Sequence, residues 1–270
     1  MKKIVGIVLV AMLIFTMTGC GGSQSSDVSD SASESISMEE SAEKSSSDGT
    51  DSLKTIFDTN EVSTEREEET EVELLPMEIK DAAVCISSPP SEYSDDIYMD
   101  FVGIIHNPNT GIAIEFPDFT VTLKDPDGSI IATEDQMGGY IAPGDTVTLV
   151  GLISAPVADI SENTQIEYDV DCSDISTNID DLVRTTDFLV EHVSERNGEK
   201  QYITGEITNI TEETVDMANV SMILRKDGEI VFAENTFVDK LRPGKPVAFE
   251  FNRYDGWPEH DDIEISVQNW

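Results

Sequence analysis

The chain has 270 residues and carries 55 acidic against 16 basic side chains, which gives a formal net charge of −39 at pH 7. This excess excludes nucleic-acid binding, because such binding needs Lys and Arg side chains that neutralise phosphates. With only three His and three Cys residues, the chain also lacks the ligands for zinc ribbons, iron–sulfur frameworks and disulfide-dense small folds.

The first twenty residues, 1–20, have the pattern of an export signal. Lys2 and Lys3 precede an apolar run over residues 4–15 that is too short to span a bilayer comfortably. The run ends in Met-Thr-Gly-Cys, which resembles the lipobox of bacterial lipoproteins. The resemblance implies that Cys20 is lipidated and anchors an extracytoplasmic protein to the cell membrane. The alternatives are an ordinary secretory signal with an incidental Cys and an uncleaved anchor.

Residues 21–76 are predicted to form a disordered linker. They contain 16 acidic and 3 basic residues, and Ser is the commonest type from Ser23 to Ser52. Their scattered apolar residues offer too little surface to offset chain entropy. A flexible coil of this length spans about 40 Å from end to end, so we expect a spacer between the bilayer and the folded part. The alternative is that the Ser-rich acidic segment itself binds cations.

From residue 77 onward, similar segments recur at a nearly constant offset. The matching pairs are 101–107 with 203–209, 121–131 with 222–231, and 141–144 with 241–244. The offset is 102 residues for the first pair and about 100 for the other two. Three markers in the same order indicate a duplicated unit. We therefore predict one domain over residues 77–172 and a second over residues 183–270.

Each copy has the texture of short β-strands. Residues 121–124 and 247–251 alternate apolar and polar side chains with a period of two, and Asp-Gly pairs supply hairpin turns. Gly103 and Gly205 lie inside strand patterns, where a missing side chain indicates a bulge or a close backbone approach. No long amphipathic helix pattern occurs after residue 77. The predicted fold class is all-β, with two tandem antiparallel immunoglobulin-like β-sandwiches after the disordered linker.

The order of these markers resembles a known family. A strand with Gly, apolar residues and Asn is followed by a strand that runs into Asp-Gly, then by Pro-Gly and a closing strand. This order is similar to that of the FxLYD-type domains among bacterial immunoglobulin-like surface modules, and it covers most of residues 77–172 and 183–270. The resemblance implies an immunoglobulin-like fold and a surface location, and it implies no catalytic residues.

Cys85 and Cys172 lie near the first and last strands of the first copy. Because these strands often run side by side and an exported protein meets an oxidising compartment, a Cys85–Cys172 disulfide is one prediction. The alternative is two reduced thiols, buried separately. The second copy contains no Cys, so such a bond is not essential to the fold.

No motif in the folded part predicts catalysis or a cofactor. The three His residues lack metal-ligand spacing, and the nucleophile elbow, the Walker loop and the dinucleotide fingerprint are absent from the sequence. We expect a protein that is not an enzyme and has no metal centre. Weak Ca²⁺ binding is considered at four Asp pairs, with turn chemistry as the alternative. The pairs are Asp125 with Asp127, Asp171 with Asp174, Asp180 with Asp181, and Asp261 with Asp262.

Tyr254 and Trp257 are the candidate ligand contacts. Both lie in a polar loop with Gly and Pro near the end of the second copy, where an exposed aromatic ring could take part in recognition. The alternative is that Trp257 folds back over the edge of the sandwich. The expected function is a non-catalytic binding or envelope-associated module with a protein or glycan partner. One alternative is a structural spacer or assembly subunit of the cell envelope. Another is a hydrolase accessory or an unrecognised enzyme, for which the export signal is the one supporting feature.

Overall fold

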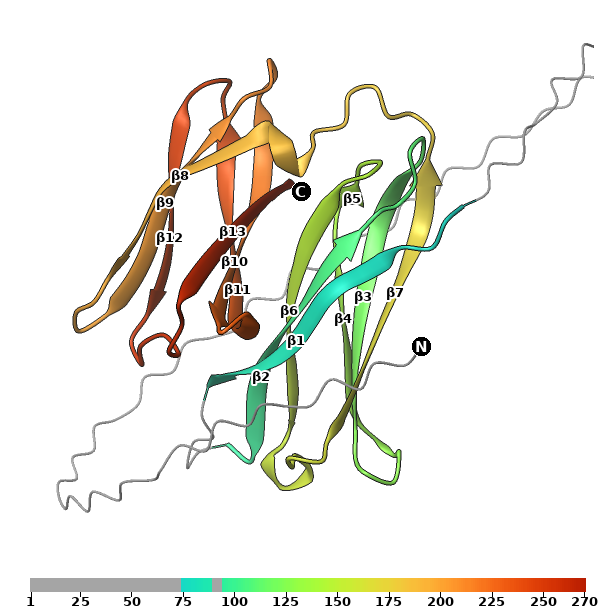
Figure 1. Cartoon of the computed structure of the whole chain (residues 1–270), viewed down its shortest axis with the longest axis vertical. Helices are drawn as coiled ribbons and strands as arrows, with labels where there is room; N and C mark the ends of the chain where they lie inside the picture. Colours follow the sequence, from blue (N-terminus) through green and yellow to red (C-terminus); the bar gives the residue numbers. More distant parts are fainter. Residues whose placement is uncertain (1–73, 89–93) are drawn as a thin grey trace, which may run out of the picture. The chain divides into compact units, whose positions relative to one another are not determined.

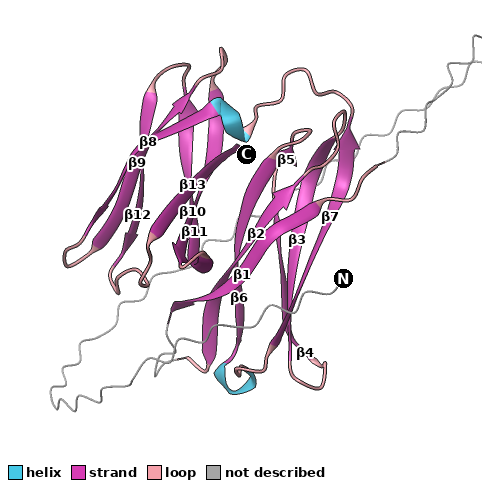
Figure 2. Ribbon diagram, viewed as in Figure 1, coloured by secondary structure: helices cyan, strands magenta, loops and turns pink. Residues whose placement is uncertain are grey.

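Strands and their connections make up the described part of the chain, with two short 3-10 turns (Figure 2). A computed structural model describes residues 74–88 and 94–270, so the predicted signal peptide, Cys20 and nearly all of the predicted linker lie outside it. The elements are β1 (Glu78–Ser88), β2 (Asp96–His106), β3 (Ala113–Lys124), β4 (Ile130–Met137), β5 (Tyr140–Ile141), β6 (Thr146–Pro156), η1 (Val157–Asp159), β7 (Gln165–Ser176), η2 (Thr185–Asp187), β8 (Phe188–Arg196), β9 (Gln201–Asn209), β10 (Val215–Lys226), β11 (Glu229–Leu241), β12 (Pro246–Arg253) and β13 (Asp262–Asn269). Because these strands pair antiparallel and the described residues contain no α-helix, the predicted all-β class is confirmed.

The first sandwich, β1 to β7, consists of two antiparallel sheets (Figure 1). One sheet has the order β1-β2-β6. In the other, β3 pairs with β7 and also with β4 and β5. Buried residues from both sheets form one apolar core, including Phe101, Ile105, Phe119, Val121 and Leu149. The alternation of apolar residues along β3 places Phe119, Val121 and Leu123 in this core.

The second sandwich, β8 to β13, repeats this topology. In one sheet β9 lies between β8 and β12, just as β2 lies between β1 and β6 in the first sandwich. In the other sheet β10 lies between β11 and β13, just as β3 lies between β4 and β7. The single strand β11 takes the place of β4 and β5, which Gly138 and Gly139 separate. Its own apolar core includes Ile203, Ile207, Met222, Phe249 and Phe251. The repeated pairing is the structural counterpart of the repeated sequence markers.

A buried asparagine ties the two sheets together at one corner of each sandwich. Asn107 Nδ2 donates to the carbonyl oxygen of Ile141 at 3.0 Å, and Asn209 Nδ2 donates to that of Leu241 at 2.8 Å. Both asparagines are fully buried. Each amide therefore joins the end of a strand in one sheet to the segment before the Pro-Gly turn in the other.

Gly103 and Gly205 lie where an aromatic ring covers the strand. A Cβ atom added at Gly103 would lie 2.7 Å from the Phe119 ring, and one added at Gly205 would lie 2.5 Å from the Phe249 ring. Such distances leave no room for a methyl group. The close approach that the sequence suggested is present at both glycines. At Gly205 the predicted bulge is present too, because the register of β8 with β9 shifts between the pairs Glu191–Glu206 and Ser194–Thr204.

The two sandwiches belong to one compact unit and share a third apolar cluster. Its buried members are Val102 and Val150 from the first sandwich and Ile223 and Ala233 from the second. The sheet β1-β2-β6 therefore contacts the sheet β11-β10-β13. Beside the cluster, the Thr148 N–H donates to Gln268 Oε1 at 3.1 Å. Apolar packing and hydrogen bonds together join the two sandwiches.

Candidate functional site

The hairpin between β8 and β9 and the loop between β12 and β13 are held together at one end of the second sandwich. Gln201, the first residue of β9, accepts the backbone N–H of Trp257 on its side-chain oxygen at 2.6 Å. Gly256 has a φ of 78° and passes directly over the Gln201 side chain. On the far side of the loop, His260 Nε2 lies 3.4 Å from a carboxylate oxygen of Glu195 in β8. These contacts fix the loop relative to both strands.

Two tyrosines and two cations meet where this loop contacts the β8–β9 hairpin. Tyr254 comes from the loop, and Arg196, Lys200 and Tyr202 come from the hairpin; we call these four residues the tyrosine–cation patch. Lys200 Nζ lies 4.6 Å from the centre of the Tyr254 ring and 5.7 Å from that of Tyr202. Arg196 Cζ lies 5.5 Å from the Tyr202 ring. The Tyr254 side chain is 76% exposed. Cation–π contacts hold the two cations over flat rings, where a ligand can reach both kinds of group.

The second predicted contact, Trp257, lies elsewhere. Its ring packs against the core of the second sandwich, with its centre 5.6 Å from that of Phe232. The Trp257 Nε1 atom is buried and has no hydrogen-bond partner. Of the two aromatic side chains expected in a recognition loop, Tyr254 is exposed, whereas Trp257 is half-buried against the core of the sandwich.

The two cysteines are free thiols, with Cys85 buried and Cys172 half-buried. On β1, Val84 packs against the first core, whereas Ala83 packs against the cluster between the sandwiches. Cys85 shares the side of Ala83, and its Sγ lies 3.8 Å from the carbonyl oxygen of Ile230. Cys172 packs against the first core. The predicted bond is not formed in the structure, because the two side chains lie on opposite sides of a sheet.

Turn chemistry accounts for the first of the Asp pairs that the sequence offered to Ca²⁺. One carboxylate oxygen of Asp125 accepts the N–H groups of Asp127 and Ser129, at 3.1 and 3.0 Å. In the last pair, Asp261 accepts the N–H of Asp227 at 3.1 Å. Within residues 74–88 and 94–270, no group of three or more His, Cys, Asp and Glu side chains could hold a metal ion. Weak Ca²⁺ binding stays a prediction.

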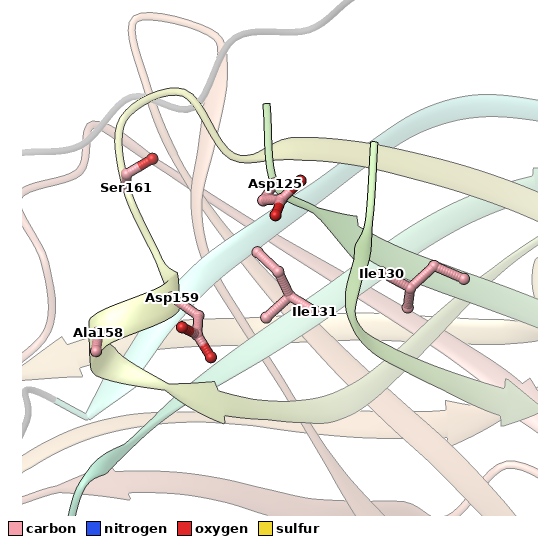
Figure 3. Close-up of a pocket in the computed structure, with 6 residues that line it drawn as sticks. All are labelled: Asp125, Ile130, Ile131, Ala158, Asp159 and Ser161. Carbon is pink, nitrogen blue, oxygen red and sulfur yellow. The ribbon is translucent and has the colours of Figure 1, made fainter. Parts of the chain in front are cut away.

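Asp125 also lines a cavity of 450 Å³ in the first sandwich (Figure 3). Its other lining residues are Ile130, Ile131, Ala158, Asp159 and Ser161. The cavity lies between the β3–β4 turn and the 3-10 turn η1, and it combines two carboxylates with two isoleucine side chains. Its acidic lining disfavours anionic ligands.

The sequence did not identify the other three members of the patch. Tyr202 lies in β9, paired with Asn252 near the end of β12, so the antiparallel register brings it beside Tyr254. Lys200 precedes β9, and Arg196 ends β8. The available signal was the hairpin itself, in which two cations flank Asn-Gly-Glu before a tyrosine in a very acidic chain. That hairpin can be predicted from the sequence, but its contact with residue 254 depends on strand pairing.

In the part of the chain that the structure describes, no helix is long and apolar enough to cross a membrane. No family model matches the chain, and no curated protein matches it. Among solved structures, a Bacteroides uniformis β-glucuronidase is similar at 14% identity and a TM-score of 0.18, over 57% of this chain and 21% of that one. The Bacteroides uniformis β-glucuronidase 2 covalently bound to cyclophellitol-6-carboxylate aziridine is similar at 12% identity and a TM-score of 0.18, over 58% and 21%. A Bacillus subtilis oxalate decarboxylase mutant is similar at 9% identity and a TM-score of 0.11, over 73% and 77%. The chain thus spans about a fifth of the length of the β-glucuronidases, and at these TM-scores the likeness assigns it neither a fold nor an activity.

Proposed function

We propose that the protein is a lipid-anchored, extracytoplasmic binding module without catalytic activity, and that it contacts its ligand through the tyrosine–cation patch. The observation that carries this proposal is the exposure of the Tyr254 ring beneath the Lys200 ammonium, on a loop that Gln201 holds in place. An exposed aromatic ring on a rigid loop supplies contact area at low entropic cost. The patch offers stacking and ion-pair contacts rather than a nucleophile beside a base.

Charge narrows the partner to an envelope protein or a glycan. The net charge of −39 repels nucleic acids and other dense polyanions over long distances. A glycan presents C–H faces that stack on Tyr rings, and a protein partner presents carboxylates that pair with Arg196 or Lys200. Both kinds of ligand fit a patch that has two flat rings and two cations.

Photo-crosslinking in cells tests the contact. We would place a benzophenone amino acid at position 254 of the full chain, displayed in a bacterial host, and look for adducts of discrete mass. The matched control carries the same group at Phe116, which is 48% exposed in the first sandwich, far along the chain from the patch. We expect an adduct from position 254 that position 116 does not give. No adduct at 254, or the same adduct at both positions, would contradict the proposal.

Metabolic labelling with an alkyne fatty acid tests the anchor. We expect the full chain to incorporate the label and Cys20→Ser to lose both the label and membrane association. A labelled Cys20→Ser variant would show that another residue carries the lipid, and an unlabelled native chain would remove the anchor from the proposal.

A spacer or assembly subunit is the second candidate function, favoured by the interface that joins the two sandwiches. Val102, Val150, Ile223 and Ala233 are all buried there, so the pair is suited to act as one stiff element. The function of a spacer depends on the length of the folded part and does not depend on the tyrosine–cation patch. A complementation assay separates the two functions: loss of function with Y254A supports binding, whereas full function of Y254A together with loss on deletion of residues 183–270 supports the spacer.

A further inference from the structure

Arg253 reaches across from the second sandwich to the first. It is the last residue of β12, and its Nη2 donates to the carbonyl oxygen of Ser87 in β1. Its guanidinium also lies over the Phe232 ring, with Cζ 4.8 Å from the ring centre. One side chain therefore contacts a strand of each sandwich and an aromatic ring of the second core.

Two carboxyl groups lie close enough to this arginine for its charge to act on both of them. Asp100 in β2 lies on the same side of its strand as Val102, which is buried between the sandwiches. Glu234 comes from β11, and its charge acts on Asp100 together with that of Arg253. The Asp100 Oδ2 and Arg253 Nε atoms are buried without hydrogen-bond partners. With both acids ionised, this acid–arginine cluster of Arg253, Asp100 and Glu234 has one uncompensated negative charge.

Few other groups face Asp100. They are Cys85 and the Ser87 hydroxyl from β1, Glu234 from β11 and Arg253 from β12. Leu152 pairs with Asp100 on β6 and carries no charge. Burial first, and then the Glu234 carboxylate, raise the pKa of Asp100 to about 7 against the opposing effects of Arg253 and of the Ser87 hydroxyl. Burial also raises the pKa of the Cys85 thiol to about 12, so this thiol stays protonated near neutral pH. Burial raises the pKa of the Glu234 carboxyl as well, against the opposing charge of Arg253, but the larger shift belongs to Asp100. Asp100 is thus the group of the cluster that exchanges a proton near pH 7.

The cluster is continuous with the loop that carries the patch. Arg253 directly precedes Tyr254, and the Phe232 ring beneath Arg253 also packs against Trp257. We propose that the acid–arginine cluster is a proton-operated latch between the two sandwiches, which positions the loop that carries Tyr254. A proton on Asp100 leaves Arg253 and Glu234 as a neutral pair and keeps the latch closed. Loss of that proton adds a buried negative charge and loosens both the interface and the loop.

This regulation rests on the proposed function only where it concerns ligand binding. The latch itself is tested without a ligand, in the full chain with Trp270→Phe, where Trp257 is the remaining tryptophan. We would record its fluorescence from pH 5 to pH 9. We expect one transition with a midpoint near 7, the pKa of the Asp100 carboxyl.

Substitutions assign the transition. D100N imitates the protonated acid, so we expect the transition to disappear and the spectrum to stay in its low-pH form. E234Q removes the charge that raises the pKa of Asp100, so we expect the midpoint to move to lower pH. D118N is the matched control, because burial also raises the pKa of Asp118 but Asp118 lies on β3, in the other sheet of the first sandwich. We expect D118N to leave the midpoint unchanged.

His260 lies on the same loop as Trp257, so its imidazole needs a separate control. We expect H260Q to keep the transition. A transition that persists in D100N, or that disappears in H260Q, would overturn the latch. If D100N fails to fold, the midpoint of the fluorescence transition in E234Q tests the latch instead. An E234Q midpoint equal to that of the parent protein would overturn the latch. A blank crosslinking result at position 254 would count against the proposed function and leave this fluorescence result standing.

Discussion

Arg225 of the second sandwich and Asp81 of the first form an ion pair, with Nη1 and Oδ2 2.8 Å apart. The same guanidinium donates through Nε to Glu264 on β13 at 2.7 Å. The Arg225 side chain is only 13% exposed. Lys226, the next residue, instead forms an exposed pair with Glu259 within the second sandwich. Adjacent cations on β10 therefore have different roles, and one of them joins the two sandwiches.

Replacing Arg225 by Ala is expected to lower the free energy of unfolding by about 1–3 kcal/mol, because two acids lose their partner at the interface. The cost stays below that of a fully buried pair, since Asp81 and Glu264 are both partly open to water. K226A is the neighbouring control and should cost much less than R225A, because the Lys226–Glu259 pair is exposed to water. Urea unfolding of the two variants checks the difference, and equal losses would show that Arg225 contributes no more than a surface ion pair.

Gly103→Ala is expected to destabilise the first sandwich by about 1–3 kcal/mol, because the new methyl group overlaps the Phe119 ring. Gly111 provides the matched control, since a Cβ added there meets nothing within 4 Å. G111A should change the unfolding free energy by less than about 0.5 kcal/mol. Thermal unfolding of both variants is the measurement. Equal melting temperatures for G103A and G111A would show that the close approach of Phe119 to Gly103 has no energetic consequence.

The strands were predictable because their signals are local. Alternation along residues 121–124, Asp-Gly at the hairpins and the repeated Gly and Asn residues depend only on near neighbours in the chain. Residues 101–105 are apolar on both faces of the strand, a pattern typical of strands covered on both sides. That pattern indicates burial of Val102. It does not name the covering residues Ile223 and Ala233, which come from a strand pair more than a hundred positions later.

The candidate site was predictable only in part, for the same reason. A polar loop with Gly and Pro made Tyr254 a recognition candidate, and the structure exposes its ring. The position of Trp257 depends on Phe232 in another strand, and the cations around Tyr254 depend on the register of β9 with β12. The acid–arginine cluster depends on contact between two domains. Contacts of these three kinds are non-local, and no periodicity in a single sequence encodes them.

Asp100 is expected to make the protein less stable as the pH rises. Burial raises the pKa of its carboxyl from 3.8 to about 7 in the folded chain, so the folded state holds this proton more tightly than the unfolded state does. The stabilisation is complete below about pH 4 and is lost as the pH rises through 7. Urea unfolding at pH 5 and pH 8, in the native protein and D100N, measures it. We expect the loss of stability between these two pH values to be smaller in D100N, and an equal loss in both proteins would contradict the assignment.

The two thiols of the folded part are expected to react at very different rates. Cys85 is buried with a pKa raised to about 12, whereas Cys172 is half-buried on β7. Burial and neighbouring aspartates raise the pKa of Cys172 as well, so both react more slowly than a free thiol. Iodoacetamide labelling of the native protein, read by mass spectrometry at each peptide, should modify Cys172 first and Cys85 only after unfolding in urea. If neither thiol is labelled until a reductant is added, Cys85 and Cys172 form the disulfide in the native protein. In that case the Cys85 side of β1 would have to face the first core.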